Sequence, residues 1–103
     1  MQHFRTYQLA LELAKLCRQI KLKGPYKNQF DRAVLSIALN LSEGSSRESK
    51  RDRRRFYEIA LGSIRETQTL IEILDLEEIR KLTDQLAASA YCLCRSLRDE
   101  GAP

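Results

Sequence analysis

The sequence has few residues that break helices or cross-link a chain. It contains 4 glycines, 2 prolines and no tryptophan among 103 residues. Strand-rich folds need turn residues every few positions, so this scarcity argues against them and favours a few long elements. With 43% hydrophobic and 31% charged residues, the composition is typical of a globular chain and not of a disordered or collagen-like one. We expect a single domain over residues 1–103, because this length leaves no room for separate cofactor and substrate domains.

Long apolar runs and paired cysteines are also lacking. No stretch approaches the roughly 20 apolar residues needed to cross a bilayer, and the N-terminal sequence does not have the layout of a signal peptide. We therefore expect no membrane contact and a cytoplasmic location. Three cysteines are an odd number, so reduced thiols are expected in place of a disulfide framework. Cys92 and Cys94 lie two residues apart, roughly 200° around a helix, and so cannot coordinate one metal ion together.

Groups that could carry catalysis are equally scarce. The single histidine, His3, lies next to a terminus, where a surface position is more common than a catalytic role. The glycines form no phosphate-cradling loop, and no cluster of carboxylates or cysteines has metal-binding spacing. We therefore expect no enzymatic activity, no cofactor and no metal, and we interpret the chain as a binding or assembly protein.

What the sequence does have is helical periodicity along most of its length. The spacing of apolar residues predicts helices over residues 4–22, 26–43, 50–74 and 76–98. Short connections between helices of this length place neighbours antiparallel. The expected fold class is therefore all-α, an antiparallel up-and-down four-helix bundle.

Turn and cap residues set the expected ends of these helices. Gly24 suits the left-handed residue that ends the first helix, and Pro25 suits the start of the second. Gly44 is expected to cap the second helix, and Ser49 to accept a hydrogen bond from the free amides that open the third. Asp75, three residues before a glutamate, resembles the start of a capping box that opens the fourth helix.

The first helix is too apolar for one side of a small bundle. Its apolar arc is about twice the roughly 100° that such a helix needs. The surplus must be buried, and in a chain this short a second copy of itself is the expected cover. We therefore expect a homo-oligomer whose interface includes Leu9, Leu13 and Leu16. In the third helix, Gly62 and Ser63 are small, which predicts the close approach of a neighbouring helix.

Positive charge is concentrated in the first half of the chain. Residues 1–55 carry thirteen lysines and arginines against five acidic residues, whereas residues 56–103 carry five against nine. Cations in the first turns of a helix are each unfavourable by a few tenths to about 1 kcal/mol, so their accumulation here needs a reason. The densest group, called the basic cluster below, consists of Arg47, Lys50, Arg51, Arg53, Arg54 and Arg55.

Two explanations of the basic cluster stay open at the level of the sequence. Acidic neighbours such as Glu43 and Asp52 can pair with these cations, and charged runs are commonly solvated faces. Alternatively, the cluster contacts the phosphates of RNA or DNA. The run lacks the interleaved aromatic residues typical of single-strand stacking, and nothing in it predicts base specificity.

Asn40 lies on the margin of the predicted core face. Its helical angle places it beside Ala33, where an unpaired amide would cost roughly 1–3 kcal/mol. We expect Asn40 and Glu43 to bond the turn at residues 44–49 and to hold its shape. Direct contact of Asn40 with a ligand is the alternative.

Two segments resemble one known family. They are SIALNLSEGSSRESKRD, over residues 36–52, and FYEIALGSIRE, over residues 56–66. Both are similar to the pattern of the four-helix-bundle proteins encoded in intervening sequences of bacterial 23S ribosomal RNA genes. The matching residues are Ser36, Ile37, Asn40, Glu43, Gly44, Arg47 and Ser49 in the first segment and Phe56, Ile59, Ala60, Gly62, Ser63 and Glu66 in the second. Ala38 departs from the pattern, where a proline is usual, and Arg53 stands where an aromatic residue is common.

The resemblance implies a left-handed up-and-down bundle that assembles into a ring, typically a homopentamer. A related branch, the accessory variability proteins of diversity-generating retroelements, binds nucleic acid together with a reverse transcriptase. The resemblance therefore implies RNA or DNA, and a protein such as a reverse transcriptase, as partners besides the chain itself. The alternative function is a structural oligomer that docks a protein partner without binding nucleic acid, and salt-sensitive binding separates the two.

Overall fold

The computed structural model describes the backbone of residues 2–100 and the side chains of residues 3–97, and this part of the chain is all-helical, without strands. The elements are α1 (Gln2–Cys17), α2 (Pro25–Ser45), α3 (Lys50–Leu74) and α4 (Arg80–Glu100), with a short 3-10 helix, η1 (Glu77–Ile79), ahead of α4. The expectation of an all-α protein with four helices is therefore confirmed.

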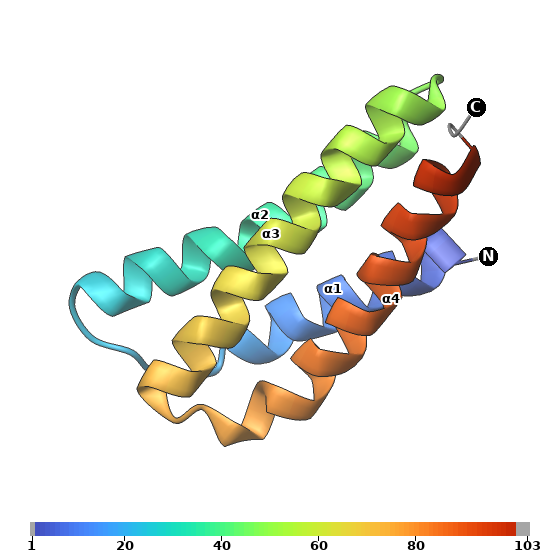
Figure 1. Ribbon diagram of the computed structural model, residues 1–103. Coiled ribbons are helices and arrows are strands. Elements are labelled where there is room, and N and C mark those ends of the chain that lie inside the picture. The colour runs from blue at the N-terminus through green and yellow to red at the C-terminus, as the bar shows by residue number, and fades with distance from the viewer. Residues whose placement is uncertain (1, 101–103) are drawn as a thin grey trace.

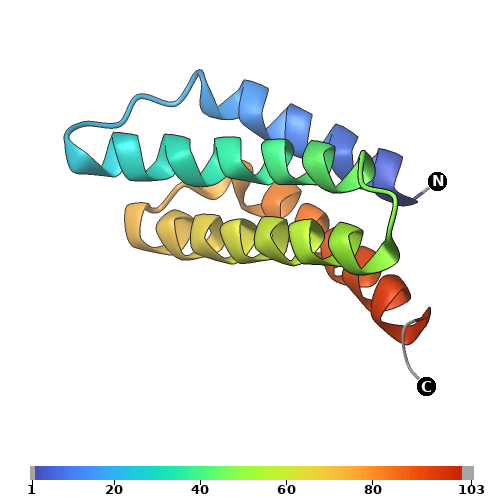
Figure 2. The same cartoon turned by 90° about the horizontal axis from the view of Figure 1, so that it is seen from above.

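Each α-helix packs mainly against two other α-helices. Contacts join α1 with α2, α2 with α3, α3 with α4, and α4 with α1. Figure 1 shows α2 and α3 side by side along most of their length, joined at the upper right by the turn at residues 46–49. Seen from above, α4 crosses this pair at an angle (Figure 2). The molecule measures 47 × 20 × 20 Å, and the turn between α2 and α3 lies at one end of it.

The first helix ends at Cys17, five residues before the predicted end. The amides of Gln19 and Ile20 donate to carbonyls only three residues back, at 3.0 and 3.1 Å, and such tight bonds close the last turn of a helix. The chain then continues without helical structure, which lets Ile20 and Leu22 pack against the core. Their partial burial depends on contacts with the rest of the core, and the spacing of apolar residues in the sequence does not reveal it.

Gly24 opens the second helix, and the prediction that it ends the first is wrong. It is the N-cap of α2, with φ 64° and ψ −146°, a backbone conformation that favours glycine. Pro25 occupies the first helical position, as expected, because its fixed φ suits a helix start and its missing amide hydrogen costs nothing there. The early end of α1 leaves Gly24 too far along the chain to cap it.

The predicted cap at Gly44 is wrong, because α2 continues through Ser45 and has its C-cap at Ser46. Gly44 is buried where α2 meets α3. A Cβ atom at Gly44 would lie 2.6 Å from Cε1 of Tyr57, closer than carbon atoms can pack. Glycine is present because the two helices approach each other closely at this point. The predicted N-cap is confirmed, since Ser49 Oγ accepts from the Asp52 amide at 3.1 Å.

Asp75 ends α3 and does not open α4, so the predicted capping box is wrong. It adopts a left-handed conformation, with φ 56° and ψ 45°, and its amide donates to the Ile71 carbonyl. Short polar residues such as aspartate tolerate this conformation better than most. The sharp reversal brings Leu76 and Ile79 into the core directly after α3.

α1 packs against both α2 and α4, and this explains its wide apolar arc. Leu9 and Leu13 are buried in the core of their own chain, so the expectation that they form an oligomer interface is wrong. Leu16 is on the surface, with 38% of its area exposed. A helix that packs between two neighbours needs apolar residues on both sides. The width of the apolar arc therefore does not tell packing within the chain from contact with a second chain.

Gly62 and Ser63 lie next to each other but have different surroundings. Ser63 meets α2, where its Oγ lies 2.9 Å from Ser36 Oγ, so a small residue does permit close packing here. Gly62 is exposed, and a Cβ atom added there would meet no described atom within 4 Å. The close approach predicted at Gly62 is therefore absent within the described chain.

Candidate nucleic-acid interface

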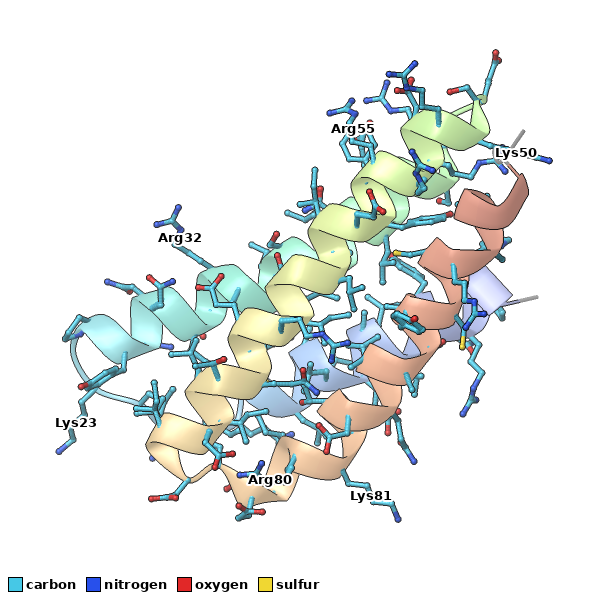
Figure 3. The ribbon with its side chains drawn as sticks, in the orientation of Figure 1. Lys23, Arg32, Lys50, Arg55, Arg80 and Lys81 are labelled. Atoms are coloured by element: carbon cyan, nitrogen blue, oxygen red, sulfur yellow. The ribbon has the colours of Figure 1, made fainter. Side chains whose placement is uncertain are left out.

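The basic cluster lies at one end of the molecule, on the turn at residues 46–49 and the first turns of α3. In Figure 3, Lys50 and Arg55 are both near this end, whereas Lys23, Arg80 and Lys81 are at the other. The structure therefore brings the six predicted cations together. It also separates them into groups with different contacts.

Arg47 and Arg53 hold the turn in shape. Arg53 Nε donates to the Arg47 carbonyl at 3.0 Å, and Arg53 Nη2 donates to the Glu48 carbonyl at 3.3 Å. Arg47 Nη2 pairs with Glu43 Oε2 at 2.5 Å, across one helical turn. These two arginines have structural partners on their own chain, so their presence does not by itself indicate a ligand.

Arg47 and Arg55 share the ring of Phe56. Their guanidinium carbons lie over the ring, 4.8 and 4.6 Å from its centre, within the range of a cation–π contact. Arg55 also approaches Asp52, at 3.9 Å, but both side chains are largely exposed and such a pair is weak. The ring thus holds the Arg55 guanidinium in place without neutralising its charge.

Arg51 and Arg54 have no ion-pair partner among the side chains that the structure describes. Together with Arg55 they line an open depression of about 580 Å³, which also borders Asp52 and Glu58. The depression lies beside the N-terminus of α3, where the helix dipole adds partial positive charge. Anions are favoured at such a place, because the arginines and the partial positive charge of the helix start attract the same sign of charge.

Asn40 and Glu43, predicted to bond the turn together, act separately. Asn40 Nδ2 donates to the carbonyl and to Oγ of Ser36, at 2.8 and 3.0 Å, one turn back in the same helix. Ser36 in turn contacts Ser63 of α3. The prediction that Asn40 bonds the turn is therefore wrong. Its amide donates to Ser36 within α2 and, through Ser36, supports the contact between α2 and α3. Glu43 does support the turn, through Arg47 and through its carbonyl, which accepts from Ser46.

Burial shifts the pKa of two groups outside the basic cluster, Cys17 and Tyr57. Burial, with a smaller contribution from the charge of Asp31, raises the pKa of Cys17 to about 12, so this thiol stays protonated and unreactive at neutral pH. Burial also raises the pKa of Tyr57, while nearby Arg53 opposes the shift.

Cys92 is exposed and Cys94 buried, which confirms that they lie on different sides of α4. No described helix is long and apolar enough to cross a bilayer, and no metal-binding group of three ligands occurs among the described residues.

The family model of the 23S rRNA-intervening sequence protein matches residues 2–100. The chain belongs to this family. A search of curated proteins found no match. The predicted resemblance is thus confirmed over nearly the whole sequence, well beyond the two segments that carried it.

The sequence patterns did not predict two features of this 23S rRNA-intervening sequence family member. The first is the role of Phe56, a motif residue directly after the arginine run, on which two arginines stack. The second is the turn-holding role of Arg53. The sequence offers a signal for the first, an aromatic residue adjacent to the run. It offers none for the second, because Arg53 bonds backbone carbonyls that only the folded turn presents.

Proposed function

We propose that this chain is a non-enzymatic accessory protein that binds RNA or DNA through phosphate contacts at its basic end. One observation carries the proposal. Arg51, Arg54 and Arg55 line the same open depression at the start of α3, and Arg51 and Arg54 have no ion-pair partner among the described side chains. Three cations held beside a helix N-terminus repel one another, and a phosphate backbone offers the matching charge.

We further infer that the helices form an antiparallel up-and-down bundle and that the bundle assembles into a ring, a homopentamer. Membership of the family supports this, as do exposed apolar side chains that assembly would cover. They include Phe4, Leu16, Leu35, Leu39, Ile59 and Ile73. A ring multiplies the basic ends on one particle, and multivalent contact raises affinity without new kinds of contact. A cytoplasmic location and a protein partner such as a reverse transcriptase complete the proposal.

Replacing Arg51, Arg54 and Arg55 by glutamate is expected to lower the affinity for ribosomal RNA fragments about tenfold or more at about 50 mM salt. The slope of log affinity against log salt should flatten by nearly 1 for each phosphate that the variant no longer neutralises. Arg53 is left in place because it holds the turn. The fold should survive, because none of the three side chains is in the core and the one in the first turn of α3, Arg51, lies where an acidic residue is favourable. Mobility-shift titrations at several salt concentrations measure both effects.

A matched control is the replacement of Lys23, Arg32 and Lys81 by glutamate. These exposed cations lie away from the basic end, and the change in net charge is the same. This variant should retain most of the affinity. If the cluster variant binds as well as the parent, or if the parent binds neither RNA nor DNA at about 50 mM salt, the nucleic-acid proposal fails. Docking of a protein partner by a structural oligomer then takes its place.

The proposed pentamer predicts the mass of the particle in solution. Multi-angle light scattering on the purified protein should give five times the 11.9 kDa of one chain. The mass should not depend on salt, because the surface to be covered is apolar. A monomer at micromolar concentration would refute the ring, and a different closed number would refute only the pentamer.

A further inference from the structure

We propose that the basic end selects single-stranded nucleic acid, by stacking one unpaired base on the Arg55 guanidinium. This inference rests on the proposed function and names the form of nucleic acid that the same depression takes. The stack has three layers, with the Phe56 ring below, the guanidinium in the middle and the base above. Arg51 and Arg54, which line the same depression, contact the phosphates that flank the stacked nucleotide.

The position of Arg55 is the first support. Its guanidinium carbon lies 4.6 Å from the centre of the Phe56 ring, and 61% of its side chain is exposed. The guanidinium thus lies against the ring, while most of the side chain is open to solvent and Arg55 also lines the depression. Its ion-pair contact with Asp52 is at 3.9 Å, between exposed side chains, and is too weak to draw the guanidinium away from the ring.

The platform below Arg55 belongs to the turn between α2 and α3. Arg47 also lies over the Phe56 ring, at 4.8 Å, and its side chain contacts Glu43 one helical turn back. The Arg47 carbonyl in turn accepts from Arg53. The ring therefore sits against a turn that hydrogen bonds keep in shape, so less conformational freedom is lost when a base binds.

The chemistry favours an unpaired base over a paired one. Bases of a duplex are already stacked on their neighbours, whereas a single strand presents base faces that stack on aromatic rings or on guanidinium planes. Arginine suits this role because its planar group can stack on one face while keeping its charge, which lysine cannot do. Interleaved aromatic residues are absent from the arginine run itself, but the fold places Phe56 beneath two of its members.

The test compares strands and duplexes by fluorescence anisotropy at one salt concentration. The probes are unstructured oligouridine and oligodeoxythymidine of about 16 nucleotides, within the common range of site sizes, and a duplex of equal total charge. The parent should bind both single strands about fivefold or more tightly than the duplex, the lower end of what one stacked base contributes. Comparison of the RNA strand with the DNA strand separates base stacking, which both can make, from a 2′-hydroxyl contact, which only RNA can make.

Arg55→Lys is the decisive variant, since it keeps the charge, removes the plane and alters an exposed side chain that the fold does not need. It should lose the preference for single strands, measured as the ratio of single-strand to duplex affinity. This ratio is the readout because Arg55 also belongs to the cations that bind phosphate, so its replacement can alter the affinity for every probe. Arg54→Lys is the matched control and should keep the preference, because no ring contact of Arg54 occurs among the described residues.

Three outcomes would overturn the inference and leave phosphate binding intact: equal affinity of the parent for strands and duplex, a preference limited to RNA, or an Arg55→Lys variant that still prefers strands. Absence of binding to any of the three probes would overturn the proposed function as well.

Discussion

Ile37→Ala is expected to lower the free energy of unfolding by about 2–5 kcal/mol. Ile37 has no exposed area and packs in the core from the middle of α2, which contacts both α1 and α3. Alanine would remove buried carbon atoms and leave a cavity that the helices on both sides cannot close without moving. Urea unfolding followed by circular dichroism measures the change. Parent and variant must be compared at one protein concentration, because association shifts the apparent stability.

Leu35→Ala is the matched control for this prediction. Leu35 lies on the same helix, two residues away, and 57% of its area is exposed. Its truncation should change the free energy of unfolding by no more than about 0.5 kcal/mol when the chains are dissociated. If the two variants lose the same stability, the inward orientation of Ile37 is contradicted.

Gly44→Ala is expected to lower the free energy of unfolding by about 1–3 kcal/mol, although alanine is a better helix former than glycine. The added Cβ atom would lie 2.6 and 2.8 Å from Cε1 and Cδ1 of Tyr57, and 3.1 Å from Cβ of Phe56. Tyr57 is only 2% exposed, so its ring cannot swing outward to make room. Relief would require α2 and α3 to separate at the end that carries the basic cluster. Thermal and urea unfolding both report the loss.

Gly62→Ala makes the same chemical change as Gly44→Ala but is expected to have the opposite effect on the free energy of unfolding. Gly62 is exposed on α3 and a Cβ atom there would meet no described atom, so alanine should raise the free energy of unfolding by about 1 kcal/mol. Opposite signs for the two variants would confirm that Gly44 serves packing. A loss of stability at both positions would instead indicate that another molecule covers Gly62.

Features that depend on nearby residues could be predicted from the sequence. Pro25 marks a helix start because its ring sets φ and removes an amide hydrogen, and Ser49 marks another because its hydroxyl reaches an amide three residues on. The start of α3 at Lys50 follows the prediction for the same reason. The concentration of cations at this helix start was also visible, since charge can be counted without knowing the fold.

Features that depend on residues far apart in the chain could not be predicted from local patterns. Gly44 is required by the ring of Tyr57, thirteen positions later, and Leu13 is buried because α2 and α4 both cover its helix. Asp75 turns left-handed because the chain must reverse there to bury Leu76. Within the basic cluster, the fold assigns Arg53 to the turn and Arg55 to the depression. The physical reason is common to all of these: contacts between distant segments outweigh local preference, and no local pattern of the sequence records them.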